Sequence, residues 1–116
     1  MSTSHSIEGL WQPLYAELDG EEPPCEVLQQ TEVELAGGKY FVRFGGEVAD
    51  QGTFELDVAG LTLRGTEGPN AGRVIPCIFK FIDDTLMICY GLGGTRPLKF
   101  TTTAGTQLYL VTYRRK

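Results

Sequence analysis

The chain has 116 residues, 15 of them glycine, and a formal net charge of −5. This length supports one domain with a single core, and the abundant glycine without long helical patterns favours many strands joined by tight turns. The negative charge argues against nucleic acid as a partner, because phosphate binding needs clustered lysine and arginine. The longest apolar run, 74–79, falls far short of the roughly 20 residues of a membrane helix, so no membrane partner is expected either.

The N-terminal segment and the cysteines bear on the cell compartment. Residues 1–6 are polar and show no secretory signal, so we expect a disordered tail there and one domain over 7–116. Cys25, Cys77 and Cys89 are odd in number and lack C-x-x-C spacing. This pattern favours buried free thiols and a cytoplasmic location over a disulfide framework. A signal peptide that had been removed would leave the same sequence, so the cytoplasm is the favoured of two locations.

The chain begins with a predicted strand over 10–17. Pro13 lies inside it and indicates a bulge or an edge position, because proline has no N–H to donate to a neighbouring strand. The next segment, 21–30, contains Pro23 and Pro24. It predicts a loop followed by a short helical turn near 24–30, which could cap one mouth of a barrel.

A two-residue turn at Gly37–Gly38 predicts a hairpin of strands 31–36 and 39–44. Residues opposite each other in an antiparallel pair share a face, so a correct register brings apolar residues together and opposite charges together. Leu35 then faces Tyr40, while Glu32 faces Arg43 on the other side. The same reasoning predicts two further hairpins.

The first of these turns at Ala59–Gly60 and places Leu56 opposite Leu63 and Glu55 opposite Arg64. The second turns at Asp83–Asp84. It pairs Phe81 with Leu86, Phe79 with Ile88, Ile78 with Cys89 and Cys77 with Tyr90, so the two cysteines point to opposite faces.

The last predicted hairpin has a three-residue loop at 103–105, with glycine in the left-handed position that such loops require. It pairs Phe100 with Leu108 and Leu98 with Leu110. Continuing this alternation puts Thr112 and Arg114 on the inner side and Tyr109, Val111 and Tyr113 outside. Arg114 is therefore the predicted partner of Trp11 in closing one end.

About nine strand segments result, and meanders of this kind close on themselves to remove exposed edges. The predicted fold class is all-β, an antiparallel up-and-down barrel of about eight to nine strands. Its interior would be lined by side chains on the inward phase of these strands. Those we single out as candidate ligand-binding residues are Tyr40, Phe44, Phe54, Phe79, Phe81 and Ile88.

Several short motifs follow one another along the chain, each occurring once. They are Gly9-Leu10-Trp11, Asp19-Gly20, Gly38-Lys39-Tyr40, 52–57, 78–81, Leu86-Met87-Ile88-Cys89 and 96–100. Over residues 7–115 this order resembles a bacterial lipocalin-like family of small, functionally uncharacterised domains, common in planctomycete-type genomes.

The resemblance implies a calycin-type barrel sealed at one end by the indole of Trp11 under an arginine, as a cation over a π-face. The chain departs from the family at Cys77, where glycine is usual, and at Asp83–Asp84, where the family has a Gly-Asp turn. Both departures affect one hairpin and leave the predicted fold intact. Because the family's own function is unsettled, the resemblance supports the architecture far more than an activity.

Candidate chemistry is sparse. The single histidine, His5, lies in the expected tail, which argues against a catalytic triad or a histidine metal site, and no metal or other cofactor is expected. No pair of acidic residues is identified among the inward positions, so an enzyme is the least favoured class. Arg96, in the glycine-rich loop 91–97, could recognise a carboxylate through its planar fork of donors, although a role in fastening the loop is favoured.

Two functions remain. The first is a lipocalin-like module that takes an apolar or amphipathic small molecule into the barrel, oriented by Arg96 or a tyrosine hydroxyl. The second is a packed-core interaction or structural module that presents Phe41, Tyr109, Val111 and Tyr113 to a protein partner, as a monomer or weak homodimer.

Overall fold

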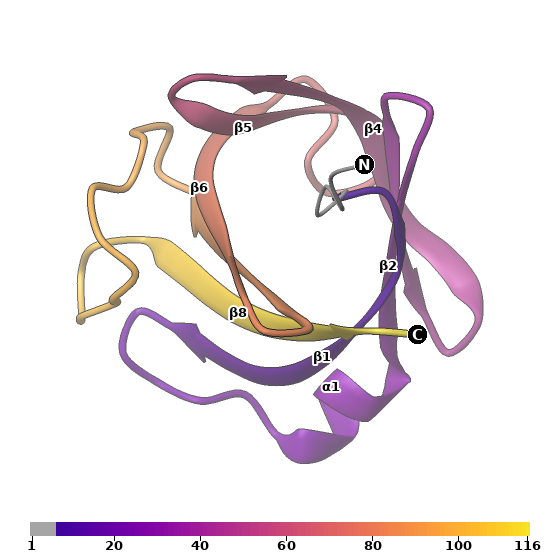
Figure 1. Cartoon of the computed structure of the whole chain (residues 1–116), viewed down its shortest axis with the longest axis horizontal. Helices are drawn as coiled ribbons and strands as arrows, with labels where there is room; N and C mark the ends of the chain where they lie inside the picture. Colours follow the sequence, from indigo (N-terminus) through magenta and orange to yellow (C-terminus); the bar gives the residue numbers. More distant parts are fainter. Residues whose placement is uncertain (1–6) are drawn as a thin grey trace.

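In the computed structural model, which describes residues 7–116, eight antiparallel strands form a closed barrel (Figure 1). Each strand pairs with its neighbours in sequence order, and the last pairs with the first. The predicted all-β, up-and-down barrel is thus confirmed, with eight strands; the expected tail 1–6, with His5, lies outside the described residues. The elements are β1 (Gly9–Leu18), α1 (Cys25–Gln30), β2 (Thr31–Ala36), β3 (Lys39–Phe44), β4 (Glu47–Asp57), β5 (Gly60–Glu67), β6 (Val74–Ile82), β7 (Thr85–Gly91) and β8 (Leu108–Arg115).

The hairpin of β2 and β3 has the predicted register, with Leu35 opposite Tyr40 and Glu32 opposite Arg43. Gly37 and Gly38 both have positive φ, 60° and 79°, as the tight hairpin turn between right-twisted strands requires. The hairpin of β6 and β7 also has the predicted register. In both cases a short turn fixes the pairing locally.

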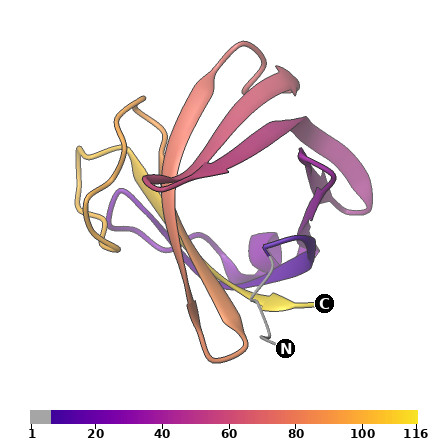
Figure 2. The same ribbon diagram turned by 45° about the horizontal axis from the view of Figure 1, so that its top comes forward.

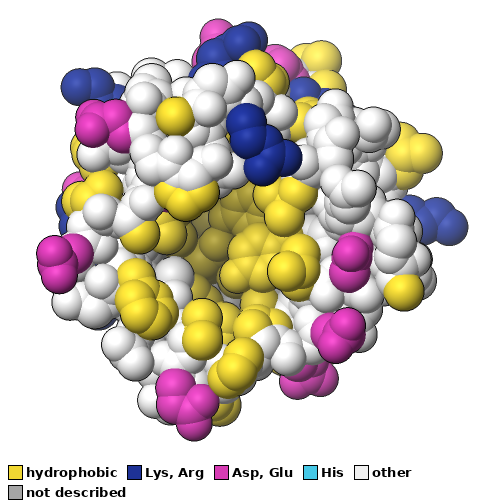
Figure 3. All heavy atoms as spheres, turned by 180° about the vertical axis from the view of Figure 1, so that it is seen from behind, with side chains coloured by type: hydrophobic (Ala, Val, Ile, Leu, Met, Phe, Trp, Pro, Cys, Tyr) yellow, Lys and Arg dark blue, Asp and Glu magenta, His cyan; other side chains and the backbone are white. Residues whose placement is uncertain are grey.

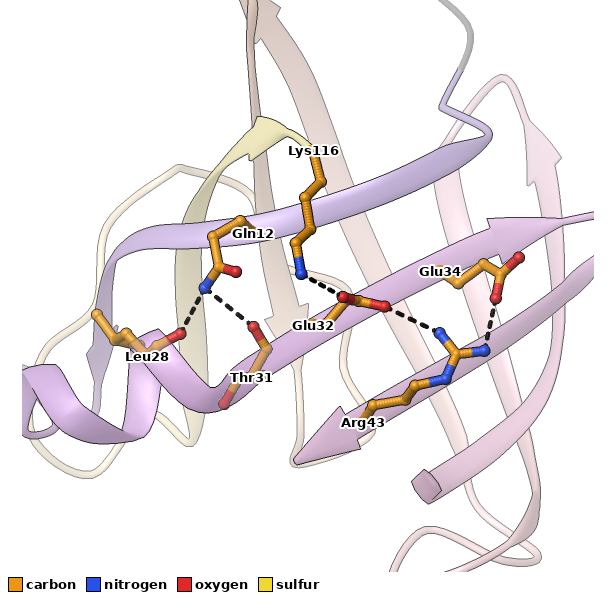
Figure 4. Close-up of polar contacts among 7 residues, drawn as sticks. All are labelled: Gln12, Leu28, Thr31, Glu32, Glu34, Arg43 and Lys116. Carbon is orange, nitrogen blue, oxygen red and sulfur yellow. Dashed lines mark hydrogen bonds and ion pairs between the residues drawn. The ribbon is translucent and has the colours of Figure 1, made fainter. Parts of the chain in front are cut away.

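The outer face of β2 and β3 carries the predicted ion pair within a larger network (Figure 4). Arg43 donates to Glu32 at 3.1 Å and to Glu34 at 2.7 Å, and Lys116 reaches Glu32 at 2.6 Å. The polar network therefore lies outside, which leaves the alternate positions of these strands to the interior.

The hairpin of β4 and β5 turns one residue earlier than predicted. Leu56 lies opposite Leu61, and the position opposite Leu63 belongs to Phe54. The Asp57 carboxylate accepts hydrogen bonds from the N–H groups of Ala59 and Gly60, at 2.8 and 3.1 Å, and so places the turn at 58–59. The register shifts by two residues, which keeps the paired side chains on their predicted faces, whereas Val58, predicted to lie opposite Leu61, is exposed in the turn.

The first strand contains the predicted irregularity, since its pairing with β8 shifts between Pro13 and Tyr15. Helix α1 forms near the predicted position and packs on β1. Gln12 fastens it there by donating to the carbonyl oxygens of Leu28 and Thr31, at 2.7 and 3.1 Å (Figure 4). In Figure 1 the helix lies outside the ring of strands, beside β1, which differs from the expected cap over a mouth. Figure 2 shows the same closed ring in a tilted view.

The largest correction concerns the last strand. The predicted strand that contains Leu98 and Phe100 does not form, and β8 pairs directly with β7 after a long loop, 92–107. Leu98 is 94% exposed, whereas Phe100 lies outside the barrel with the Lys80 ammonium 4.5 Å from its ring centre. Without the predicted partner strand the alternation of β8 shifts by one residue, so Val111 and Tyr113 are buried.

This shift also changes how one end of the barrel closes. Trp11 is 1% exposed, and its indole N–H donates to the Ile7 carbonyl at 2.8 Å. The cation over the indole belongs to Arg115, 4.2 Å from the ring centre, because Arg115 is the residue opposite Trp11. Arg114 is exposed, so the prediction for this residue was wrong by one position. Phe81 completes the closed end, with its ring centre 6.4 Å from that of Trp11.

Candidate ligand-binding cavity

A cavity of about 300 Å³ lies inside the barrel, and Trp11 is not among the residues that line it. Figure 3 shows the hollowed face, where hydrophobic side chains line the depression. The lining includes residues of the β5–β6 and β7–β8 loops, which places the mouth at the end opposite the indole. The lining residues are Pro13, Thr31, Val33, Leu35, Tyr40, Val42, Ala49, Asp50, Leu61, Leu63, Pro69, Asn70, Ile75, Ile88, Tyr90, Leu92, Tyr109 and Tyr113.

The carboxylate of Asp50 is one polar feature of this wall. Its side chain points inward because Asp50, Gly52 and Phe54 alternate on the buried face of β4. An extra residue, Ala49, breaks the pairing between β3 and β4 just before it, which is the pattern of a β-bulge. Bulges are common at barrel rims and re-aim neighbouring side chains.

Asp50 is 8% exposed and accepts hydrogen bonds from two residues. The Tyr40 hydroxyl donates to Oδ2 at 3.2 Å, and Asn70 donates to Oδ2 through its side-chain amide at 2.8 Å and to Oδ1 through its backbone N–H at 3.4 Å. Burial, and then the charge of Asp50, raise the pKa of Tyr40. Tyr40 therefore stays a neutral donor, and the carboxylate also fastens the β5–β6 loop.

Three tyrosines form the second polar feature. The hydroxyl oxygens of Tyr90 and Tyr113 lie 2.6 Å apart in the interior, and Tyr109 stacks on Tyr90 with ring centres 5.5 Å apart. Burial raises the pKa of all three hydroxyls, so they remain protonated. Two hydroxyls hold two hydrogens and their mutual bond uses one, which leaves one donor for a ligand or water.

Of the predicted ligand-binding residues inside the barrel, some line the cavity and others pack in the core beside it. Tyr40 and Ile88 line the cavity. Phe54 is buried in the core outside the lining, and Phe79 and Phe81 pack edge to face, with ring centres 6.2 Å apart, towards the closed end. These three rings fill the space that the prediction assigned to a ligand.

Two predicted residues lie outside the interior. Phe44 is 45% exposed at the last position of β3, beyond the bulge at Ala49, and does not line the cavity. Arg96 donates to the carbonyl oxygens of Cys77 and Leu61, at 2.6 and 3.2 Å, and to the Thr62 hydroxyl at 2.9 Å. These contacts fasten the β7–β8 loop to β5 and β6, which is the favoured alternative for this arginine.

Among the residues of the wall that the sequence did not predict, four carry its two polar features: Asp50, Tyr90, Tyr109 and Tyr113. Tyr90 could have been found by extending the inward alternation of Ile88 by one step. Tyr109 and Tyr113 were placed outside because of the phase error in β8. Asp50 carried a signal in its alternation with Phe54, but the search for a pair of inward acids did not identify this single carboxylate.

The cysteines are free thiols. Cys77 and Cys89 are buried on opposite faces of the β6–β7 hairpin, as predicted, but Cys25 is exposed at the start of α1. Burial raises the pKa of the Cys77 thiol to about 12, so it is unreactive at neutral pH. Within 7–116, no three His, Cys, Asp or Glu side chains gather closely enough to hold a metal ion.

Protein-family models, curated proteins and solved structures were each searched, and none matches this chain. Over the described residues, the helix content includes no segment long and apolar enough to cross a membrane.

Proposed function

We propose that this protein is a small lipocalin-like module that binds an apolar or amphipathic small molecule inside its barrel. The observation that carries the proposal is the apolar cavity of about 300 Å³ with a few polar groups in its wall, the usual composition of a ligand site. Its volume is roughly twice that of a 150 Å³ cavity that holds benzene, so a two-ring molecule is the expected size. The spare hydroxyl hydrogen of the Tyr90–Tyr113 pair would orient it.

The proposal is for binding and not for catalysis. Among the described residues of the cavity wall, Asp50 is the one carboxylate, and general acid–base chemistry on a sugar would need two. We place the protein in the cytoplasm, supported by three free cysteines, which suit a reducing compartment.

The alternative, a packed interaction module, was based mainly on an exposed tyrosine-rich face of β8. Tyr109, Val111 and Tyr113 belong to the inward phase of β8, and Val111 and Tyr113 are 0% and 3% exposed. A tyrosine-rich outer face for a protein partner or a homodimer therefore does not exist on this strand. A monomer is the expected state for the binding module.

Native mass spectrometry of freshly purified protein, beside a denatured sample, tests for a carried ligand. Extra mass that disappears on denaturation is the expected result. Titration with the neutral two-ring probe naphthalenemethanol, followed by calorimetry, tests the empty cavity. If no mass is carried and the probe does not bind, the proposal fails.

A matched pair of variants shows whether the probe binds in the cavity or elsewhere on the protein. Val42 lines the cavity, whereas its neighbour Phe41 is half-buried on the outer face, under the Arg43 guanidinium. Val42→Trp should fill the cavity and abolish probe binding, and Phe41→Trp should leave it unchanged. Equal loss in both variants would place the probe elsewhere.

A further inference from the structure

The Asp50 carboxylate is a buried charge whose hydrogen-bond partners are all neutral. They are the Tyr40 hydroxyl and the two amide N–H donors of Asn70. No Lys or Arg among residues 7–116 lies within the 4.0 Å of an ion pair with it. Buried charges in proteins are usually paired with a charge of opposite sign.

The nearest cation in this network, the guanidinium of Arg73, contacts Asn70 and not Asp50 itself. Arg73 is exposed and donates to Oδ1 of Asn70 at 3.2 Å, so one amide group separates the guanidinium from Asp50. Arg73 also donates to the Leu92 carbonyl oxygen, which holds it at the loops. The carboxylate itself, with about four lone-pair positions and three donors, keeps acceptor capacity towards the cavity that it lines.

A purely structural role does not require a charge at this position. The donors from Tyr40 and Asn70 are neutral, so a neutral side-chain acceptor could fasten the loop without the cost of burying a carboxylate. A charge held in an apolar wall has already lost most of its water. It therefore interacts with an incoming cation more strongly than a surface carboxylate would.

The same cavity offers aromatic faces. Tyr90 and Tyr109 stack in its wall, and Tyr40 and Tyr113 line it as well. Ammonium groups are attracted to the electron-rich faces of such rings, and several rings around one site strengthen the preference. The net charge of −5 adds a long-range attraction for cations.

We infer that the ligand is an organic cation, an aromatic or aliphatic body carrying a protonated amine, with the amine at Asp50 and the body in the apolar cavity. This inference rests on the proposed function, because it specifies the chemical class of the ligand for the same cavity. An anionic molecule of the same shape should bind most weakly, because the carboxylate of Asp50 repels it.

Three naphthalene derivatives of nearly equal size test the inference on the intact wild-type protein. They are naphthylmethylamine, which is cationic at neutral pH, naphthalenemethanol, which is neutral, and naphthoic acid, which is anionic. Isothermal titration calorimetry should give the amine a dissociation constant about tenfold or more below that of the alcohol, with the acid the weakest. Raising the salt concentration should reduce the amine's advantage only slightly, because the charge pair is buried.

Two variants that each remove one negative charge from β4 show where the preference arises. Asp50→Asn should bind the amine and the alcohol equally, whereas Glu47→Gln, an exposed position on the same strand, should keep the wild-type ratio. The wild-type ratio stands even if Asp50→Asn fails to fold, so the test does not depend on that variant.

The outcomes separate the two proposals. If the alcohol binds but the amine binds no more tightly, the cation inference is overturned and the binding function stands. If the acid binds best, the inference is overturned too. If none of these molecules binds and no mass is carried, the binding function fails and the cation inference fails with it.

Discussion

At the closed end of the barrel, Trp11, Phe81 and Arg115 fill the space between the strands, whereas at the other end three tyrosines leave an open cavity of about 300 Å³. Both ends rely on inward aromatic side chains. The difference lies in their polar atoms. The indole N–H of Trp11 is bonded to the backbone carbonyl of Ile7, so this donor is not available to a ligand.

At the tyrosine end, polar groups remain available to a ligand: one hydroxyl hydrogen of the Tyr90–Tyr113 pair and the carboxylate of Asp50. Substitutions at the closed end should therefore lower stability, whereas substitutions at the open end should alter both stability and ligand binding. The contrast between the ends can be tested by the following variants and conditions.

The largest effect is expected for Trp11→Ala. Removing a side chain that is 1% exposed leaves a large cavity and should lower the free energy of unfolding by about 3–5 kcal/mol. Urea denaturation followed by circular dichroism measures it. Leu98→Ala, at a position 94% exposed, is the control and should change the free energy by less than about 0.5 kcal/mol. Similar losses in the two variants would contradict the role assigned to Trp11.

Alkaline pH should destabilise the tyrosine end. Burial raises the pKa of Tyr90 and Tyr113 in the folded barrel, so above about pH 10 the unfolded chain loses tyrosine protons that the folded chain keeps. The free energy of unfolding should then fall by up to about 1.4 kcal/mol per pH unit for each tyrosine. The urea midpoint from neutral pH to pH 11 measures the slope, and the double variant Tyr90→Phe/Tyr113→Phe should make it shallower. An unchanged slope would show that these hydroxyls do not control the alkaline transition.

The effects of removing the Tyr90 and Tyr113 hydroxyls on the free energy of unfolding should not be additive. Tyr90→Phe leaves the Tyr113 hydroxyl without its partner at 2.6 Å and should cost about 1–2 kcal/mol. Tyr113→Phe should cost a similar amount, and the double variant less than the sum, because no unpaired hydroxyl remains. A double-mutant cycle from urea unfolding provides the coupling energy. Strict additivity would mean that water replaces the missing partner fully.

The smallest effect separates two adjacent arginines. Arg115 lies over the Trp11 ring and donates to the Glu8 carbonyl at 2.8 Å, whereas Arg114 is exposed on the other phase of β8. Arg115→Gln should lower the free energy of unfolding by about 0.5–1 kcal/mol, the value of an exposed cation–π contact. Arg114→Gln removes the same charge and should change stability far less. The opposite order would support the original prediction for Arg114.

The sequence was sufficient for two of the local hairpins, whereas the turn between β4 and β5 was predicted one residue too late. The turns at Gly37–Gly38 and Asp83–Asp84 fix their hairpins over a few residues, and the pair of Glu32 and Arg43 checks the register from the outer face. The phase of β8 depends instead on which strand lies beside it. Leu98 and Phe100 have the alternation of a strand, and nothing local shows that this segment stays a loop, so every inward residue of β8 was assigned to the wrong face.

The cavity was predictable only in part for a related reason. Tyr40 and Ile88 followed from strands whose register was right. Whether inward side chains meet or leave space depends on how all eight strands close, which no single alternation determines. Asp50 was missed because an inward carboxylate runs against the ordinary pattern of burial. Such exceptions are common at functional sites.

The pairing of β1 with β8 has a consequence for folding. Trp11 and Arg115 are neighbours in the ring although nearly the whole chain separates them, so closure depends on the contact with the greatest sequence separation. Barrels dominated by such contacts fold in milliseconds to seconds. Until β8 docks, β1 and β7 are unpaired edges that the β8 of a second copy could fill equally well. Exchange of the last strand between two copies is therefore the characteristic misassembly of this architecture.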